Sequence, residues 1–185
     1  KIFDKDISNL NLEQSQEVKQ QFSYLFQFGA LFSFLTVIEN IAVMLKEYTN
    51  LPNDLIEKIA YTNLEIVGLP KNCAKLYPSE ISGGMKKRVA LARSLALEPK
   101  ILFLDEPTSG LDPASTQMIN ELIIYLRDVL NITIVIITHD LETIKTVLDR
   151  FVILKKDIIF DGNIKEAMNS DNEFIKDFLT NKKAL

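Results

Sequence analysis

The sequence predicts an α/β fold with a parallel core sheet and a largely helical segment in the same chain. Residues 101–104 are a continuous apolar run, as is typical of a parallel strand buried on both faces, and residues 132–137 predict a second buried strand. Helical patterns separate these runs and follow them, and such alternation characterises α/β proteins. Residues 34–95 carry helical spacing almost throughout, so this segment is expected to be mostly helical.

The N-terminal elements are expected to be short. Residues 1–3 predict a strand, and residues 4–6 predict a polar turn. A second strand is expected over residues 22–28, which are apolar and aromatic and end at Gly29.

Two helices are expected next. Apolar side chains recur at helical spacing over residues 36–48. Pro52 fits the first turn of a second helix, and Gly68 can close that helix in the left-handed conformation.

The second half alternates helices with strands. Ser82 precedes a helix that is expected to reach residue 97, and the strand at 101–104 follows. Asp112 and Pro113 then cap and start another helix. After the strand at 132–137, residues 151–160 predict a hairpin that turns at 155–157, and the tail predicts polar helix.

Composition excludes several classes of protein. The 185 residues are 47% hydrophobic and 25% charged, which suffices for one core, and the net charge of −4 argues against a nucleic-acid binder. The single Cys73 excludes an intrachain disulfide framework. The most apolar stretch, 30–45, is interrupted by Glu39 and Asn40 and is too short to span a bilayer, so a membrane role would require a partner.

Two carboxylates follow the apolar run at 101–104. Phosphoryl transfer requires an acid that holds magnesium and a group that orients the attacking water, and Asp105 and Glu106 suit these roles. The carboxyl end of a parallel strand is also where α/β sheets bind ligands. Taken alone, the pair fits a polar strand end equally well.

Ser82, Gly83 and Gly84 precede a predicted helix. Glycines let the backbone approach a ligand closely, and the free N–H groups at a helix start attract phosphate. Because a lone Ser-Gly-Gly sequence is common, this motif by itself favours a structural role.

Together the motifs resemble the ABC-type ATPase cassette. The resemblance rests on Glu-Ile-Ser-Gly-Gly-Met at 80–85, Leu-Asp-Glu-Pro-Thr-Ser-Gly-Leu-Asp at 104–112 and Thr-His-Asp at 138–140, in that order. It implies a P-loop NTPase-type fold, here partial, with a parallel core sheet and a helical signature subdomain. One N-terminally truncated domain is expected over 1–185. Its parts would be a sheet region with the Q-loop (1–33), the helical subdomain (34–95) and the C-terminal part of the RecA-like lobe (96–185).

The resemblance assigns roles to individual residues. Ser82, Gly83 and Gly84 correspond to the signature loop, which contacts the γ-phosphate of ATP held by the other subunit. Asp105 corresponds to the Walker B acid that holds Mg²⁺, and Glu106 corresponds to the catalytic base.

Three further residues acquire roles in the same way. Asp112 ends a segment similar to the D-loop, which crosses the dimer interface. His139, the only histidine, corresponds to the switch residue that hydrogen-bonds the γ-phosphate, although without the family a surface role would be favoured. Gln27 resembles the Q-loop glutamine that senses Mg²⁺ and nucleotide. The apolar residues 28–35 either pack into the helical lobe or dock on a transmembrane partner.

Finer matches are similar to the Mla/Mkl-type ATPases. They include Leu-Phe-Gln at 25–27, Thr-Val-Ile-Glu-Asn-Ile-Ala at 36–42 and Met85, where many cassettes have glutamine. This resemblance implies ATP and Mg²⁺ as cofactors and phospholipid transport across the cell envelope as the function. It also implies a homodimer, an integral-membrane permease, an MCE-domain lipid-binding protein and a site on the cytoplasmic face of the inner membrane.

No G-x-x-x-x-G-K-[ST] sequence occurs in the 185 residues, and the first residue is Lys1 rather than Met, as in a chain that is cut or partly recorded. That loop binds the phosphates in this family. We therefore expect these residues alone to be poorly soluble and inactive. The alternative function is a non-catalytic fragment that lends its signature loop to an intact partner.

A soluble DNA-repair or translation member of the family is disfavoured, because there is no sustained heptad pattern and the chain is acidic.

Overall fold

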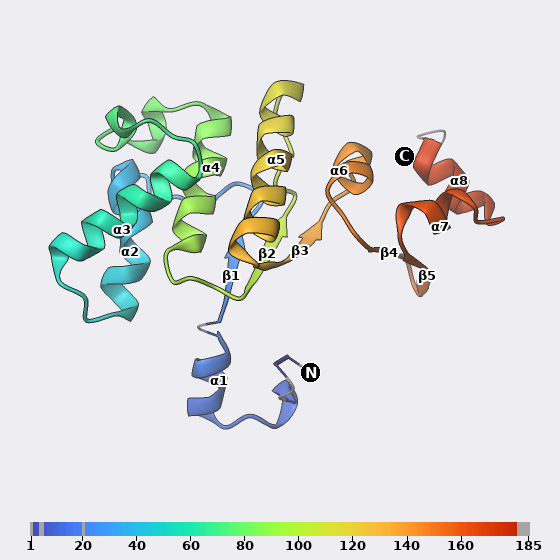
Figure 1. Ribbon diagram of the computed structural model, residues 1–185, viewed down its shortest axis with the longest axis horizontal. Helices are drawn as coiled ribbons and strands as arrows, with labels where there is room; N and C mark the ends of the chain where they lie inside the picture. The colour runs from blue at the N-terminus through green and yellow to red at the C-terminus, as the bar shows by residue number, and fades with distance from the viewer. Residues whose placement is uncertain (1, 4–5, 20, 181–185) are drawn as a thin grey trace. The chain divides into compact units, whose positions relative to one another are not determined.

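The computed structural model describes residues 2–3, 6–19 and 21–180, and these form two compact units, Lys1–Ile137 and Thr138–Leu185. The first unit contains a three-stranded parallel sheet of β1 (Phe22–Leu25), β2 (Ile101–Asp105) and β3 (Thr133–Ile137), with β2 in the centre. Figure 1 shows the three strands side by side. The parallel sheet confirms the expected fold class.

Only one face of this sheet is well buried. Leu102 and Leu104 on β2 are almost fully buried, whereas Tyr24, Val135 and Ile137 are 50%, 42% and 66% exposed. The expectation that residues 132–137 form a buried strand was therefore wrong, whereas residues 101–104 are buried or half-buried throughout. Helix α4 (Gly83–Leu95) packs against β1, and α5 (Pro113–Leu130) packs against β3.

Three helices make up the helical segment, as predicted. Helices α2 (Val37–Tyr48), α3 (Asn53–Ile66) and α4 pack against one another and bury Ile41 and Leu64. Thr36 and Glu39 form a capping box at the start of α2, which fixes the helix start locally.

Helix α3 matches its predicted limits closely. Pro52 is its N-cap and thus lies just before the helix rather than within its first turn. Gly68 follows the helix end with a φ of +67°, the left-handed conformation that was expected there. Two 3₁₀ turns, Lys71–Cys73 and Pro78–Glu80, connect α3 to α4.

The N-terminal elements differ from prediction. The structure has a 3₁₀ turn at Ile7–Asn9 and helix α1 at Leu12–Lys19, where no helix was expected. Ile2 forms an isolated bridge rather than a strand, and the other parts of the expected strand and turn at Lys1, Asp4 and Lys5 lie outside the described residues.

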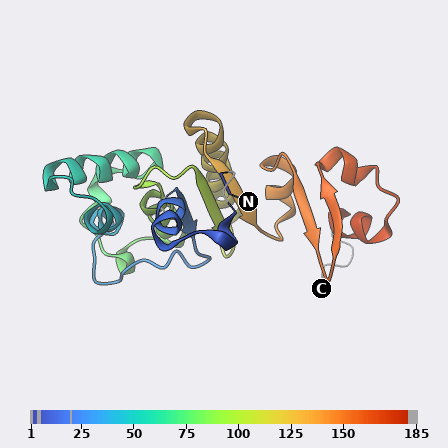
Figure 2. The ribbon, with the colours of Figure 1, turned by 90° about the horizontal axis from the view of Figure 1, so that it is seen from below.

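The second unit surrounds its own small core. Helices α6 (Leu141–Thr146), α7 (Ile164–Met168) and α8 (Glu173–Thr180) accompany the antiparallel pair β4 (Phe151–Leu154) and β5 (Ile158–Gly162), seen in Figure 2. The pair confirms the predicted hairpin.

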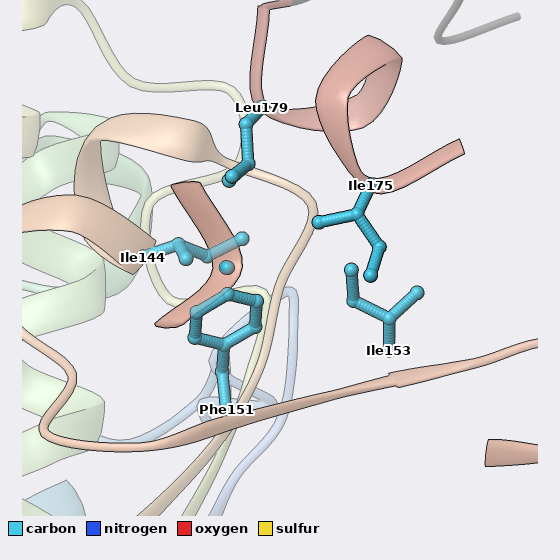
Figure 3. Close-up of a cluster of buried hydrophobic side chains, with 6 residues drawn as sticks. Ile144, Phe151, Ile153, Ile175 and Leu179 are labelled. Carbon is cyan, nitrogen blue, oxygen red and sulfur yellow. The ribbon is translucent and has the colours of Figure 1, made fainter. Parts of the chain in front are cut away.

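Figure 3 shows how elements distant in sequence supply the core of this unit. Ile144 of α6, Phe151 and Ile153 of β4, and Ile175 and Leu179 of α8 converge on one apolar cluster. In the part of the chain that the structure describes, no helix combines the length and the apolar character of a membrane span.

Candidate functional site

The carboxyl edge of the parallel sheet brings three of the predicted site residues together. β2 ends at Asp105 and continues into Glu106, and β1 pairs with β2 up to Leu25, just before Gln27. The amide Nε2 of Gln27 donates to Ser109 Oγ at 3.4 Å, which links the turn after β1 to the turn after β2. Asp105 is exposed and Glu106 is half-buried, with its carboxylate oxygen Oε2 buried, so a ligand can reach Asp105 more readily than Glu106.

The expected strand at 22–28 ends early because a turn follows Leu25. The backbone N–H of Gly29 donates to the carbonyl of Phe26 at 2.8 Å, and Gly29 has a φ of +74°. Arg93 of α4 holds this turn, since its guanidinium donates to the carbonyls of Gly29 at 2.7 Å and Ala30 at 2.8 Å. The turn that carries Gln27 is thereby fixed to the signature helix.

The backbone of Glu106 has an unusual conformation. Its φ of +45° lies in the left-handed region, where a residue with a Cβ costs about 1–2 kcal/mol relative to right-handed backbone. Hydrogen bonds hold it on both sides. Its N–H donates to Ile137 O at 2.9 Å, and its carbonyl accepts from Ser109 N at 3.2 Å and Lys87 Nζ at 3.1 Å. Such strain persists where the surroundings determine it, and it is typical of functional sites.

Lys87 is a site residue that the sequence analysis did not single out. Its side chain is only 7% exposed, and its Nζ donates to the carbonyls of both Gln27 and Glu106. Burial lowers the pKa of Lys87, and the negative charges of Glu106 and Asp105 oppose that shift. The run Met-Lys-Lys-Arg resembles a solvated charged surface. Helical spacing to the buried Leu91 was the signal that could have identified Lys87.

The signature residues form the start of α4. Ser82 is its N-cap, and its Oγ accepts from Met85 N at 3.2 Å. Ser82 and Gly83 are exposed, and a Cβ at Gly83 would meet no atom within 4 Å. A hydroxyl that accepts one hydrogen bond can still donate its proton, so Ser82 remains able to bind a phosphate oxygen.

Asp112 lies at the start of a neighbouring helix. It caps α5, accepting from Ser115 N at 3.0 Å and Ser115 Oγ at 2.6 Å, and the hydroxyl of Ser115 lowers the pKa of Asp112. A Cβ at Gly84 would lie 3.3 Å from Ser115 Oγ, so the starts of α4 and α5 are adjacent. Two adjacent helix N-termini favour an anionic ligand.

His139 lies in the second unit. It is exposed and precedes Asp140, whose carboxylate caps α6 by accepting from Thr143 N at 3.1 Å. The role of His139 as the switch residue stays a prediction.

The donor set at the sheet edge fits Mg²⁺ that is shared with a phosphate ligand. Within the described residues, no three His, Cys, Asp or Glu side chains form a closed metal cage. Mg²⁺ is usually bound by one or two protein oxygens, with water and substrate phosphates completing its coordination. The carboxylate of Asp105 and the amide oxygen of Gln27 are ligands of this kind.

A separate cavity of about 530 Å³ lies away from this edge. It lies beside the N-terminal ends of β2 and β3, and its lining includes Leu55, Ile59, Pro99, Leu130 and Ile132. This cavity contains none of the predicted site residues, which lie at the carboxyl edge of the sheet.

Fold and motifs together define an ATP-binding cassette, and comparison with known proteins agrees. The family model for the ABC transporter matches residues 1–109. The chain belongs to the ABC transporter family.

Within that family the chain is similar to named transport ATPases. It is 38% identical to the intermembrane phospholipid transport system ATP-binding protein MlaF of Haemophilus influenzae, a match that covers 96% of this chain and 68% of that protein. It is 36% identical to MlaF of Escherichia coli, with 96% and 66% covered. It is also 36% identical to the probable ribonucleotide transport ATP-binding protein mkl of Mycobacterium leprae, with 96% and 51% covered. The chain thus spans about two thirds of the MlaF relatives and half of mkl.

Solved structures show the same fold. The cassette cbiO1 of Clostridium perfringens, part of the ABC transporter complex cbiONQ, aligns with a TM-score of 0.81 at 31% identity over 96% of this chain and 70% of that one. The cassette MJ0796, solved as a dimer bound to ADP and Pi, aligns with a TM-score of 0.76 at 26% identity, over 88% and 72% of the two chains.

Proposed function

We propose that this chain is the ATP-binding and ATP-hydrolysing subunit of a transporter that moves phospholipid across the cell envelope. The observation that carries the proposal is the juxtaposition of Gln27, Asp105 and Glu106 at the carboxyl edge of the sheet. A glutamine and two carboxylates at such an edge supply what phosphoryl transfer needs from the protein.

In this proposal each residue has a distinct task. Asp105 and Gln27 hold Mg²⁺, which neutralises charge on the phosphates when ATP is bound. Glu106 accepts a proton from the attacking water and orients it. The left-handed backbone of Glu106 sets the direction in which that carboxylate leaves the strand end.

Two copies of the chain would complete each site. The exposed Ser82 and Gly83 at the start of α4 reach the γ-phosphate bound on the other subunit, with Gly84 and Asp112 beside them. A two-fold dimer uses the same surface on both subunits, so two equivalent sites form. His139 supplies a further hydrogen bond to the γ-phosphate.

The transported substrate and the partners are inferred from the relatives. The MlaF relatives are named for intermembrane phospholipid transport, and the one from Haemophilus influenzae is 38% identical to this chain. The MlaF of Escherichia coli and mkl, which is named for ribonucleotide transport, are each 36% identical. An integral-membrane permease and an MCE-domain lipid-binding protein are the proposed partners, at the cytoplasmic face of the inner membrane.

Exposed aromatic side chains support docking on a permease. Phe28 and Phe34 are 88% and 73% exposed, whereas Leu31 and Leu35 in the same segment are half-buried. The segment 28–35 therefore both packs into the helical lobe and offers an apolar surface, which suits contact with another protein.

The 185 residues alone are proposed to be inactive. They contain no G-x-x-x-x-G-K-[ST] sequence, and the candidate site offers no other glycine-rich loop for the β- and γ-phosphates. Hydrolysis is therefore proposed for these residues only when they are joined to such a loop.

The direct test is Glu106→Gln in a protein that contains these residues together with a phosphate-binding loop. Turnover should fall by about 10²–10⁴-fold, because the amide cannot accept the proton of water. The ATP-bound dimer should accumulate, which light scattering or native mass spectrometry would detect. Glu121→Gln on the exposed side of α5 is the matched control and should hydrolyse normally. Unchanged turnover in Glu106→Gln would contradict the proposal.

A further inference from the structure

We propose that Lys87 is a positioning residue for the catalytic edge: its ammonium group holds the backbones of Gln27 and Glu106 in their working geometry. The inference rests on the proposed function, because its consequence is a change in ATP turnover. It assigns a role to a buried lysine of the signature helix for which the motif roles above do not account.

The contacts of Lys87 converge on the two turns that build the site. Its Nζ donates to the carbonyl of Gln27, 60 residues away in the sequence, and to the carbonyl of Glu106 at 3.1 Å. A lysine is rarely buried unless its charge is paired or hydrogen-bonded. The two carbonyls therefore account for a cation that is only 7% exposed.

The hydrogen bond to the carbonyl of Glu106 matters because Glu106 itself has a strained backbone. Glu106 has a φ of +45°, and the peptide that follows is held by Lys87 Nζ together with Ser109 N. Removal of the ammonium group takes away one of these two hydrogen bonds, so the peptide gains freedom to rotate. Rotation of this peptide redirects the Glu106 carboxylate. Misplacement of a reacting group lowers the rate of turnover rather than the affinity for ATP.

Lys87 also fixes Gln27 relative to Glu106. The side chain of Gln27 contacts Ser109 Oγ at 3.4 Å, while its carbonyl contacts Lys87. The four residues therefore form one connected group that includes both turns and α4. Since Ser82 caps the same helix, the Lys87 side chain connects the helix that carries the signature loop to both turns of the catalytic edge.

The test compares three substitutions at Lys87 with one at its neighbour, in a protein that contains these residues and a phosphate-binding loop. Lys87→Met keeps the apolar stem and removes the donors, so kcat should fall by about tenfold to a hundredfold while KM for ATP changes less than about threefold. Lys87→Arg keeps a charged donor and should recover part of kcat. Lys87→Gln keeps an uncharged donor, and its kcat should lie between those of Lys87→Met and Lys87→Arg.

Lys86→Met is the matched control, because Lys86 is the adjacent lysine on α4 and is more exposed than Lys87. It should hydrolyse ATP at the unmodified rate. Hydrogen exchange gives a readout independent of turnover: in Lys87→Met the amides of Gly29 and Ser109, which belong to the two turns, should exchange faster than in Lys86→Met.

Two results would overturn the inference. One is a Lys87→Met protein with unchanged kcat. The other is a loss of kcat matched by an equal loss of ATP-binding sites, which indicates misfolding, with no recovery in Lys87→Arg or Lys87→Gln. Normal turnover in Glu106→Gln would instead refute the proposed function, so the two failures are distinguishable.

Discussion

Asn40 illustrates how a single buried side chain fixes the loop that follows the catalytic edge. Its amide is fully buried, and Nδ2 donates to the carbonyls of Phe32 at 3.1 Å and of Leu35 and Thr36 at 3.0 Å. Its Oδ1 accepts from Phe32 N at 2.8 Å. One residue of α2 thus satisfies the backbone of the loop whose aromatic side chains form the proposed permease contact.

Asn40→Ala should lower the free energy of unfolding by about 2–3 kcal/mol, because it removes the side-chain hydrogen bonds to Phe32 N and to the carbonyls of Phe32, Leu35 and Thr36. The carbonyls of Phe32 and Thr36 keep their backbone partners, so the loss falls mainly on Phe32 N and Leu35 O. Urea denaturation of the two proteins measures the difference. Asn50→Ala, in the exposed loop after α2, is the control and should change stability by less than about 0.5 kcal/mol. Equal effects at the two positions would show that the buried amide has no special role.

At the residue scale, the sequence predicted what depends on near neighbours. The caps at Ser82 and Asp112 involve residues three positions away, so local pattern suffices to find them. Lys87 and Arg93 escaped prediction because their partners lie 19 to 64 residues away and are backbone carbonyls, which no side-chain pattern reveals.

At the element scale, the turn after β1 packs tightly against α4. Gly29 has a φ of +74°, and a Cβ there would lie 3.2 Å from the Cβ of Ala90. Gly110, in the segment before α5, has the same φ of +74° but has no atom within 4 Å of its Cβ position. Substitutions at these two glycines therefore share the cost of backbone strain, but only a substitution at Gly29 also disturbs packing.

Gly29→Ala should destabilise the chain more than Gly110→Ala does. Each adds the left-handed strain of about 1–2 kcal/mol, but only Gly29→Ala also forces the turn away from α4. The midpoints of urea unfolding measure both. A larger loss in Gly110→Ala would contradict the close packing of this turn on the helix.

The order of helices and strands was predictable, whereas the burial of individual strand residues was not. Helices with a clear apolar face, such as α2, and the hairpin at 151–160 followed from periodicity and turn residues. A continuous apolar run carries no alternation, so it could not show that Val135 and Ile137 would be exposed. Helix α1 was missed because Leu12–Lys19 has few apolar side chains.

At the scale of the whole molecule, motif order predicted the family, although no single motif could. Each short motif has a structural alternative, but the signature, Walker B and switch sequences occur in the expected order. The division into Lys1–Ile137 and Thr138–Leu185 was not predicted, because it depends on how contacts distribute in space.

ATP hydrolysis by this cassette is expected to depend on a phosphate-binding loop and on the signature sequence of a second subunit. The most direct measurement is Mg²⁺-dependent ATP turnover by the 185 residues alone and by the same residues joined to a G-x-x-x-x-G-K-[ST] segment. We expect no turnover above background from the first protein. The joined protein should hydrolyse ATP and should lose that activity with Ser82→Arg. Turnover by the 185 residues alone would contradict the need for the phosphate-binding loop, and full activity in the joined Ser82→Arg protein would contradict the need for the signature sequence.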